Sequence, residues 1–525
     1  MSPVPGIVAV TLVTLATLAI GTVGLRLSRT TSDFFVASRS VRPGLNASAI
    51  GGEYLSAASF LGVAGLLLVF GAEMLWYPVG WTAGYLVLLV LVAAPLRRSG
   101  AYTLPDFAEA RLGSRRVRRA CTLLVVAIGW LYLLPQFQGA GVTLVTAVGA
   151  PPWLGAVMVA TVVLLNVTSG GMRSITFVQA FQYWLKLTAL LVPAAVLLAV
   201  WVGDGRPGPA RSLVDPEETA VDPQAGAGSG PADLWSLPLG GAGAESLYVT
   251  YSLILATFLG TMGLPHVVVR FYTNPDGRAA RRTTLVVLGL LGLFYVIPPV
   301  YGALGRVYAA ELAAGGRADT LVLELPRLVV GGPAGDVLTG LVTAGAFAAF
   351  LSTSSGLAIA VAGVLGQDVV GRLGRRGGRR LGGVAAFRVA AVIAVLVPCV
   401  AALSTPGVGV ARAVGLAFAV AASTFCPLLV LGIWWRGLTA AGALAGLAVG
   451  GGGSGAAVLW TLLPTSAGQE GWVATLLGQP AAWSVPTAFL AMWLVSLATR
   501  AHVPAGANRF MVRLHTPEDV ELDRG

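Results

Sequence analysis

Apolar runs of about twenty residues recur along the whole chain, and they constrain its fold more than any other feature. A run of this length can cross the hydrocarbon core of a bilayer as an α-helix. Because lipid cannot hydrogen-bond the backbone, such a chain forms either bundled helices or a closed barrel. Hydrophobic residues make up 56% of the chain and charged residues only 11%, which excludes an ordinary soluble domain. The sequence predicts an all-α polytopic membrane protein with thirteen transmembrane helices.

The arginines indicate the orientation of these helices. Only Lys186 among the 34 basic residues is a lysine, and the arginines cluster between apolar runs, for example at 97–98, 111–119 and 372–380. Positively charged loops stay in the cytoplasm, so the N-terminus is expected outside and the C-terminus inside. No basic residue precedes the first apolar run, 7–25, which is typical of a retained helix rather than a signal peptide. The net charge of +11 therefore indicates cytoplasmic loops and no nucleic-acid partner, and we expect a multi-pass protein of a bacterial cell membrane.

One predicted span, residues 45–70, is interrupted near its middle by Gly51, Gly52 and Glu53. Glycine weakens a helix, and a carboxylate at membrane depth is typical of a functional site. Unwound backbone is tolerated in a membrane only where it is packed in protein or lines a wet cavity. The segment therefore predicts a broken helix at a site. A tilted helix whose glycines let a neighbour approach closely explains the same residues equally well.

A second span, residues 247–269, is interrupted at 260–266, where Pro265 cannot donate to the carbonyl of Thr261. Unwound N–H groups near Gly260 and Gly263 would face a carboxylate. Each interrupted helix lies near the start of a group of five spans. Because five is an odd number, the second group crosses the membrane in the opposite direction and is inverted relative to the first. Paired interruptions of this kind predict the midplane site of a transporter. Taken alone, Pro265 is equally compatible with a kink relieved by water or packing.

A third span, residues 337–365, places Ala349, Ser352 and Thr353 on one helix face. Two hydroxyls and a carbonyl on that face could bind a hard cation such as sodium at the first interruption. The simpler alternative is that the hydroxyls bond to carbonyls of their own helix.

Further polar residues lie within apolar runs. The candidate substrate contacts are Ser56, Gln136, Gln138, Gly260, Thr261 and Gly263. Gln136 and Gln138 could instead hydrogen-bond between helices. Glu53 and Lys186 are expected at similar depths, and they either pair or are satisfied separately. His266 is predicted to be a capping or gating residue rather than a proton carrier.

Several motifs in these segments match a known family. They lie at residues 53–62, 169–172, 259–266, 270–273 and 367–368. With them the chain resembles the sodium/solute symporter family, in its acetate or short monocarboxylate branch. The resemblance implies a leucine-transporter (LeuT-like) fold built from a 5+5 inverted repeat. It divides the chain into a peripheral helix and loop (1–43), a first repeat (44–202), an external loop (203–245), a second repeat (246–436), peripheral helices (437–500) and a cytoplasmic tail (501–525).

The resemblance also implies a sodium site. Its ligands would be the carbonyls of Gly52, Leu55 and Ala349 and the hydroxyls of Ser352 and Thr353. The chain has the hydroxyl pair that some relatives of this branch lack, which favours sodium. Where other branches carry an acidic or amide residue it has Tyr54, so substrate contacts of proline or sugar carriers do not transfer.

We therefore expect a sodium-coupled symporter that takes up acetate-like monocarboxylates by alternating access, with no cofactor beyond the coupling ion. Its partners would be the solute, sodium and the lipid bilayer, with the oligomeric state left open. One alternative is proton coupling through Glu53 in the same fold. Another is a solute sensor, which the short tail at 499–525 disfavours. No nucleophile, base and metal constellation suggests an enzyme.

Overall fold

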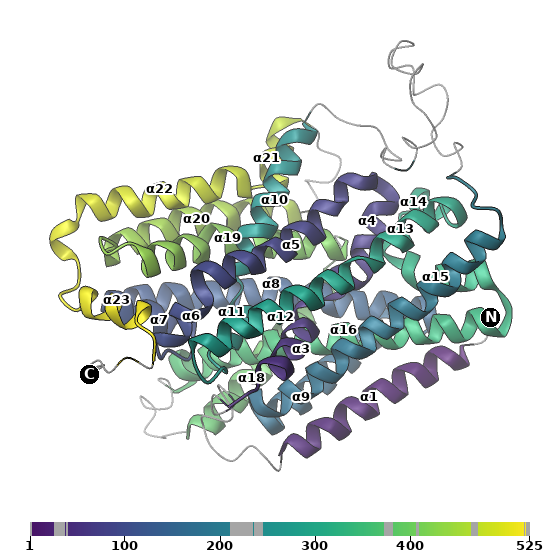
Figure 1. Cartoon of the computed structure of the whole chain (residues 1–525), viewed down its shortest axis with the longest axis horizontal. Coiled ribbons are helices and arrows are strands. Elements are labelled where there is room, and N and C mark those ends of the chain that lie inside the picture. The colour runs from purple at the N-terminus through teal and green to yellow at the C-terminus, as the bar shows by residue number, and fades with distance from the viewer. Residues whose placement is uncertain are drawn as a thin grey trace, which may run out of the picture.

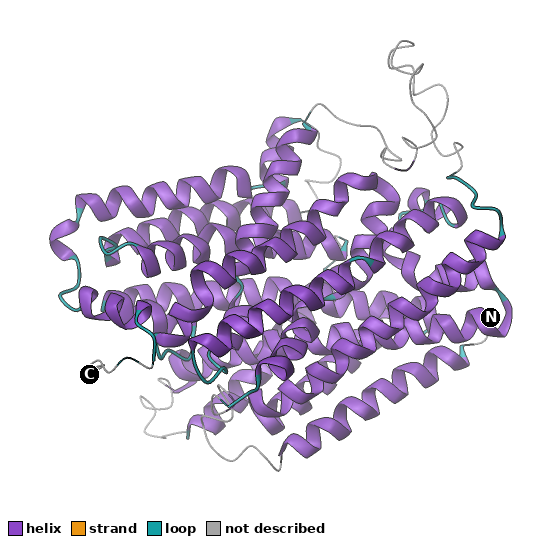
Figure 2. Cartoon of the chain, viewed as in Figure 1, coloured by secondary structure: helices purple, strands orange, loops and turns teal. Residues whose placement is uncertain are grey.

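The computed structural model describes residues 3–25, 37, 40–209, 235, 245–371, 382–405, 409–463, 471–518 and 520. Within these residues every regular element is a helix (Figure 2). The long helices lie side by side along the long axis of the molecule, with α1 starting near one end and α23 lying at the other (Figure 1). The predicted all-α fold class is confirmed.

The N-terminal half contains the elements α1 (Val4–Leu25), α3 (Pro43–Tyr54), η2 (Ala58–Gly62), α4 (Val63–Phe70), η3 (Gly71–Leu75), α5 (Trp76–Val87), η4 (Leu88–Val92), α6 (Ala93–Arg98), α7 (Leu104–Leu112), α8 (Arg115–Val148) and α9 (Pro152–Gly203). The C-terminal half contains α10 (Ser246–Gly263), α11 (Pro265–Phe271), α12 (Gly277–Tyr295), α13 (Ile297–Tyr308), α14 (Glu311–Ala314), η6 (Ala318–Thr320), α15 (Leu321–Val330), α16 (Gly332–Leu365), η7 (Gly366–Val370), α18 (Gly383–Ser404), α19 (Val410–Trp434), α20 (Ala440–Leu462), α21 (Trp472–Gly478), α22 (Ala481–Ala498), η9 (Arg500–His502) and α23 (Ala507–His515).

Ten helices in the described part of the chain are long and apolar enough to cross a membrane, or eleven if the bent pair α10 and α11 is one span. Two of the ten are unusually long, covering 41 residues at 58–98 and 52 residues at 152–203. A straight helix of the second length would measure about 78 Å, against a hydrocarbon core of about 30 Å. Both contain a glycine at positive φ, Gly71 at 76° and Gly171 at 57°, so neither is one straight helix.

The first interruption lies one turn later than its glycines predicted. α3 continues through Gly51 and Gly52 and ends at Tyr54, and Leu55 has a non-helical ψ of 86°. The glycines instead allow a close approach, because a Cβ on Gly52 would lie 2.1 Å from the carbonyl oxygen of Gln179 in α9. The expectation that the helix breaks at the glycines is wrong: they are packing residues, and the break follows them.

The second interruption is confined to Leu264, which has a ψ of 120° between α10 and α11. The two helices meet at a bend of 44°. Gly260 and Gly263 belong to α10, where a Cβ would collide with the carbonyl oxygens of Phe418 and Ala421 in α19. The expectation of unwound N–H groups at these glycines is therefore wrong, because close packing keeps this segment helical.

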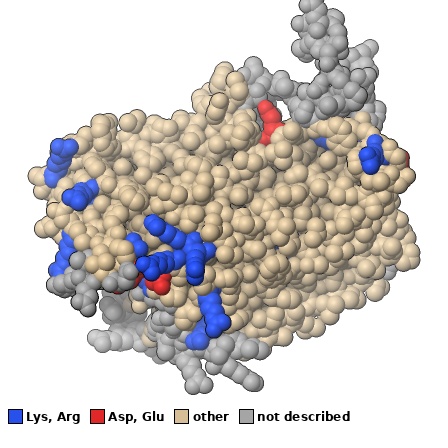
Figure 3. All heavy atoms as spheres, in the orientation of Figure 1, with Lys and Arg blue, Asp and Glu red and all other residues tan. Residues whose placement is uncertain are grey.

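Charged side chains on the face shown in Figure 3 gather mainly at the end that carries α6, α7 and α23, and the broad middle is free of charged atoms. This distribution fits the arginine clusters from which the orientation was predicted. The 372–380 cluster and most of the predicted external loop, at 210–234 and 236–244, lie outside the described residues.

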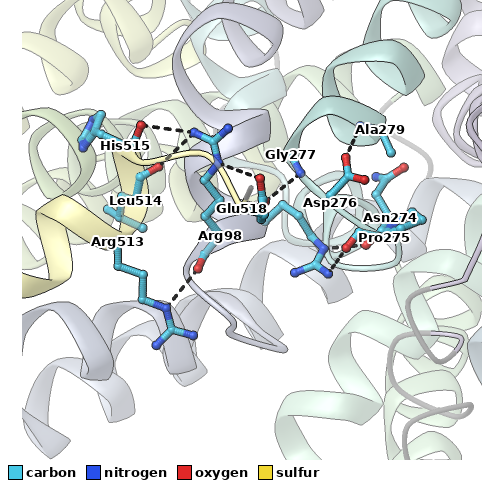
Figure 4. A network of polar contacts seen from close by, with 11 residues as sticks. Arg98, Asn274, Pro275, Asp276, Gly277, Ala279, Arg513, Leu514, His515 and Glu518 are labelled. Carbon is cyan, nitrogen blue, oxygen red and sulfur yellow. Dashed lines mark hydrogen bonds and ion pairs between the residues drawn. The ribbon is translucent and has the colours of Figure 1, made fainter. Parts of the chain in front are cut away.

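A polar network at this end joins the C-terminal segment to the bundle (Figure 4). Glu518 accepts from Arg98 Nε at 3.3 Å and from the Gly277 backbone N–H at 2.9 Å. Asp276 caps α12 by accepting from the Ala279 N–H at 2.7 Å, and Arg513 donates to the Arg98 carbonyl. The tail thus connects the end of α6 to the start of α12.

Candidate functional site

The carbonyl oxygens at the end of α3 converge on one side chain from α9, Lys186. Its ammonium donates to the carbonyl oxygen of Gly52, to that of Leu55 at 2.7 Å and to Ser352 Oγ of α16 at 2.9 Å. An ammonium carries three N–H donors, so all three are used. Lys186 is fully buried, and α9 packs against both α3 and α16.

The other two predicted sodium ligands adjoin this position. Ser352 Oγ donates to the Ala349 carbonyl oxygen at 3.1 Å, and Thr353 Oγ1 donates to the Glu53 carbonyl oxygen at 2.6 Å. The fold thus brings the predicted ligand set together from α3 and α16, although Glu53 and Thr353 are 300 residues apart in sequence. A protein cation contacts Gly52, Leu55 and Ser352.

Glu53 does not pair with Lys186. Its Oε2 accepts from Arg270 Nε of α11 at 2.6 Å, and Arg270 Nη1 also donates to Thr176 Oγ1 of α9 at 2.9 Å. Both charged side chains are at most 2% exposed. Of the two alternatives, the pairing of Glu53 with Lys186 is wrong, because each charge has its own partners. Lys186 donates to the freed carbonyls of α3, and Glu53 accepts from the second broken helix.

An aromatic cluster lies next to both breaks. Its centre is Phe418 of α19, whose ring centroid lies 5.7 Å from Trp81, 5.9 Å from Tyr132 and 6.3 Å from Tyr54. Tyr85 meets Tyr54 edge to face at 4.7 Å. The Tyr54 hydroxyl hydrogen-bonds to Thr261 Oγ1 at 2.7 Å, which joins the end of α3 directly to α10.

Several buried donors in this cluster have no hydrogen-bond partner among the described residues. They include Trp81 Nε1 and the Tyr85 hydroxyl, which are one turn apart on α5. Ser56 Oγ lies near the Tyr132 phenol but also makes no hydrogen bond of ordinary geometry. Most buried polar groups in proteins are satisfied, so a cluster of unsatisfied donors indicates a place for an acceptor from a ligand.

The remaining predicted substrate contacts divide into two groups. Gln136 is buried at the first break, where its Oε1 accepts from the Ala57 N–H at 3.1 Å. Thr261 Oγ1 bonds to Tyr54 and to the Thr257 carbonyl oxygen, so it is satisfied within the protein. The contacts of Gln138 lie away from both breaks. Its amide donates to the Thr405 carbonyl oxygen, and its side chain lines a separate cavity of about 670 Å³.

His266 is the second residue of α11 and is fully buried. Its ring meets Tyr132 edge to face at 5.3 Å, and neither ring nitrogen hydrogen-bonds to another described residue. The predicted capping role is wrong, because the ring faces the aromatic cluster rather than the carbonyls of a helix end.

The candidate site residues did not include Arg270, Trp81, Tyr85 or Phe418. The i, i+4 spacing of Trp81 and Tyr85 puts both on one helix face, but aromatic residues at this spacing usually serve packing. Arg270 belongs to one of the matched motifs, yet only the bend at Leu264 turns it toward α3.

The chain matches the model of the "Sodium:solute symporter family" over residues 34–450. It is 33% identical over 499 residues to the "Monocarboxylic acid transporter" of Corynebacterium glutamicum, covering 91% of this chain and 88% of that protein. It is 30% identical over 487 residues to the "Uncharacterized symporter YwcA" of Bacillus subtilis (strain 168), covering 91% of each.

Solved structures of low sequence identity share the fold. A Na⁺-coupled sialic acid symporter, in its substrate-bound outward-open state, superposes with a TM-score of 0.66 at 14% identity, covering 94% of this chain and 98% of that one. MhsT in complex with L-phenylalanine gives a TM-score of 0.51 at 16% identity, covering 87% and 98%. The predicted LeuT-like fold is supported by these neighbours. The extent of the family match and the identity to both relatives together establish that the chain belongs to the sodium:solute symporter family.

Proposed function

We propose that this family member is a symporter that carries a short monocarboxylate such as acetate, together with a cation, by alternating access. The observation that carries the proposal is the group of unsatisfied donors in the aromatic cluster, Ser56 Oγ, Trp81 Nε1 and the Tyr85 hydroxyl. A carboxylate is an acceptor-only group, so it complements these donors. An apolar remainder of the solute would pack against the surrounding rings.

Buried charge supports the same substrate class. Among the described residues, the charged side chains that contact the broken turn of α3 or Glu53 are Glu53, Arg270 and Lys186. Two cations with one anion leave one positive charge. A single carboxylate bound beside them would balance it. The name of the relative from Corynebacterium glutamicum agrees with this class of substrate.

The proposed topology has thirteen spans, with the N-terminus outside and the C-terminus inside. If the two long helices at 58–98 and 152–203 each cross twice, and α10 with α11 crosses once, the ten candidates become thirteen. The broken helices then open two inverted repeats, at 44–202 and 246–436, flanked by the peripheral and loop segments predicted from the sequence. Broken helices at the start of both repeats are what a midplane site requires.

Sodium is the coupling ion that the family implies, and the resemblance gives the oxygens of Gly52, Leu55, Ala349, Ser352 and Thr353 as its ligands. A proton-coupled symporter of the same fold is the second candidate. One observation favours the proton-coupled candidate: the ammonium of Lys186 already donates hydrogen bonds to Gly52, Leu55 and Ser352.

The test is uptake of labelled acetate, propionate and pyruvate into proteoliposomes, under a sodium gradient or a pH gradient. Tyr85→Phe keeps the ring, Trp81→Phe replaces the indole by a smaller aromatic ring, and each change removes one donor. A hydrogen bond to a charged group contributes about 1.5–3 kcal/mol, so each change should raise KM roughly 10-fold or more.

Tyr183→Phe is the matched control, because the Tyr183 hydroxyl donates to the Leu290 carbonyl oxygen outside the aromatic cluster. It should leave KM near that of the wild type. An unchanged KM in both Trp81→Phe and Tyr85→Phe, or no uptake of any of the three acids, would contradict the proposal.

A further inference from the structure

We infer that Lys186 is a built-in replacement for sodium: its ammonium occupies the position predicted for the ion, so the wild-type protein binds no sodium there. The inference deepens the proposed function, on which it rests, by assigning the occupant of the coupling site. The position itself is defined by geometry alone, where the broken end of α3 faces α16.

The ammonium satisfies the same oxygens that would coordinate an ion. It donates to Gly52 O, to Leu55 O at 2.7 Å and to Ser352 Oγ at 2.9 Å. The direction of the Ser352 hydrogen bonds is consistent with this role. The hydroxyl donates its proton to the Ala349 carbonyl oxygen, so its oxygen is free to accept from the ammonium. All acceptors are neutral, as expected for a site that holds a single positive charge.

Sodium and the ammonium exclude each other at this position. An ion bound by these oxygens would need the volume that the nitrogen fills, and Lys186 is fully buried, so it has no solvent to move into without a rearrangement of the helices. Two like charges in contact inside the protein would also repel strongly.

No carboxylate among the described residues competes for the ammonium. Glu53 follows Gly52, whose carbonyl accepts from the ammonium, but the Glu53 Oε2 accepts from Arg270 Nε. Lys186 is therefore held by the end of α3, where the free carbonyls and the helix dipole favour a positive charge. Lys186 thus connects α3 to α16, as a bound ion would, and also connects both helices to α9.

The test compares the full-length purified protein in sodium, potassium and N-methylglucamine chlorides, without substrate, by thermal unfolding. Sodium should not raise the Tm of the wild type above its value in the other two salts. Lys186→Ala removes the ammonium and leaves its oxygens unpaired around an open space, so sodium should now raise the Tm selectively. Adding Ser352→Ala to that variant should abolish the gain.

Lys186→Met is the matched control, because it removes the charge but keeps the bulk of the side chain at the ion position. It should be less stable than the wild type and gain no response to sodium. A Lys186→Ala protein that folds but shows no selective response to sodium would overturn the inference.

The wild type decides the question if the Lys186 variants do not fold. A sodium-specific rise in its Tm that Ser352→Ala abolishes would overturn the inference, whereas equal Tm values in the three salts would support it. These measurements need no substrate. A failure of monocarboxylate uptake would therefore count against the proposed function and not against the occupant of this site.

Discussion

The buried pair of Glu53 and Arg270 should be the strongest single electrostatic contact between the two broken helices. Its atoms lie 2.6 Å apart, and the side chains are at most 2% exposed. Removing one partner of such a pair leaves an uncompensated buried charge and typically costs about 3–5 kcal/mol. We therefore expect Glu53→Gln and Arg270→Met each to destabilise the protein by about this amount.

The double variant should lose much less than the sum of the single variants, because no charge is left alone. If the two sites were independent the losses would add to about 6–10 kcal/mol, whereas a true pair predicts a coupling energy of about 3 kcal/mol or more. The cycle can be measured by equilibrium unfolding of the purified protein in mixed SDS micelles, with membrane abundance as a second readout. Additive losses would refute the assignment.

A surface pair provides the control for this cycle. Arg317 and Glu324 are 3.4 Å apart, and Arg317 is 59% exposed. Exposed pairs contribute about 0–1 kcal/mol, so Arg317→Met should change stability little.

Three further predictions concern packing, a charge network at Arg118, and pH. Gly52→Ala places a methyl group 2.1 Å from a backbone oxygen of α9 and should reduce the folded fraction recovered by size-exclusion chromatography. Gly452→Ala is the control, because a methyl group there would have no atom of a neighbouring segment within 4 Å. Equal recovery of the two variants would contradict the close approach of α3 and α9. Arg118 contacts Asp106, Glu109 and Asp368, so Arg118→Met leaves three carboxylates together. It should lower the Tm more than Arg388→Met, whose arginine donates to the Thr168 carbonyl oxygen. A smaller loss would argue against the network. Burial raises the pKa of Asp319, whose carboxylate accepts from the Val410 N–H. Ionisation of Asp319 therefore lowers the stability of the folded protein. This loss is absent below the unfolded pKa of about 4 and complete above the folded pKa, so the Tm should fall as pH rises through that window, and Asp319→Asn should make the fall shallower. Parallel Tm profiles of the variant and the wild type would exclude Asp319 as the cause.

The sequence determined the class of the protein because the relevant physics is local. Spanning helices follow from the length of each apolar run, and their orientation is predicted from arginines a few residues away. Glycine and proline weaken a helix, so the sequence predicted breaks in the two correct helices, although Gly51 and Gly52 themselves stay helical. The oxygens of Ser352 and Thr353 were also predicted to face the first break, as they do.

Only the tertiary structure decided which groups meet. Gly51 lies against the Tyr183 ring, and Gly52, Gly260 and Gly263 lie against carbonyl oxygens of neighbouring helices. All four glycines stay helical, and the breaks lie at Leu55 and Leu264. The partners of the charges could not be predicted either. Glu53 and Lys186 have opposite signs and were expected at similar depths, yet the Glu53 carboxylate accepts from Arg270, 217 residues away. The sequence sets how deep a side chain lies in the membrane, but the direction in which it points depends on how each helix is rotated and bent against its neighbours. That is a property of the packed bundle, and it alone placed an ammonium at the position predicted for an ion.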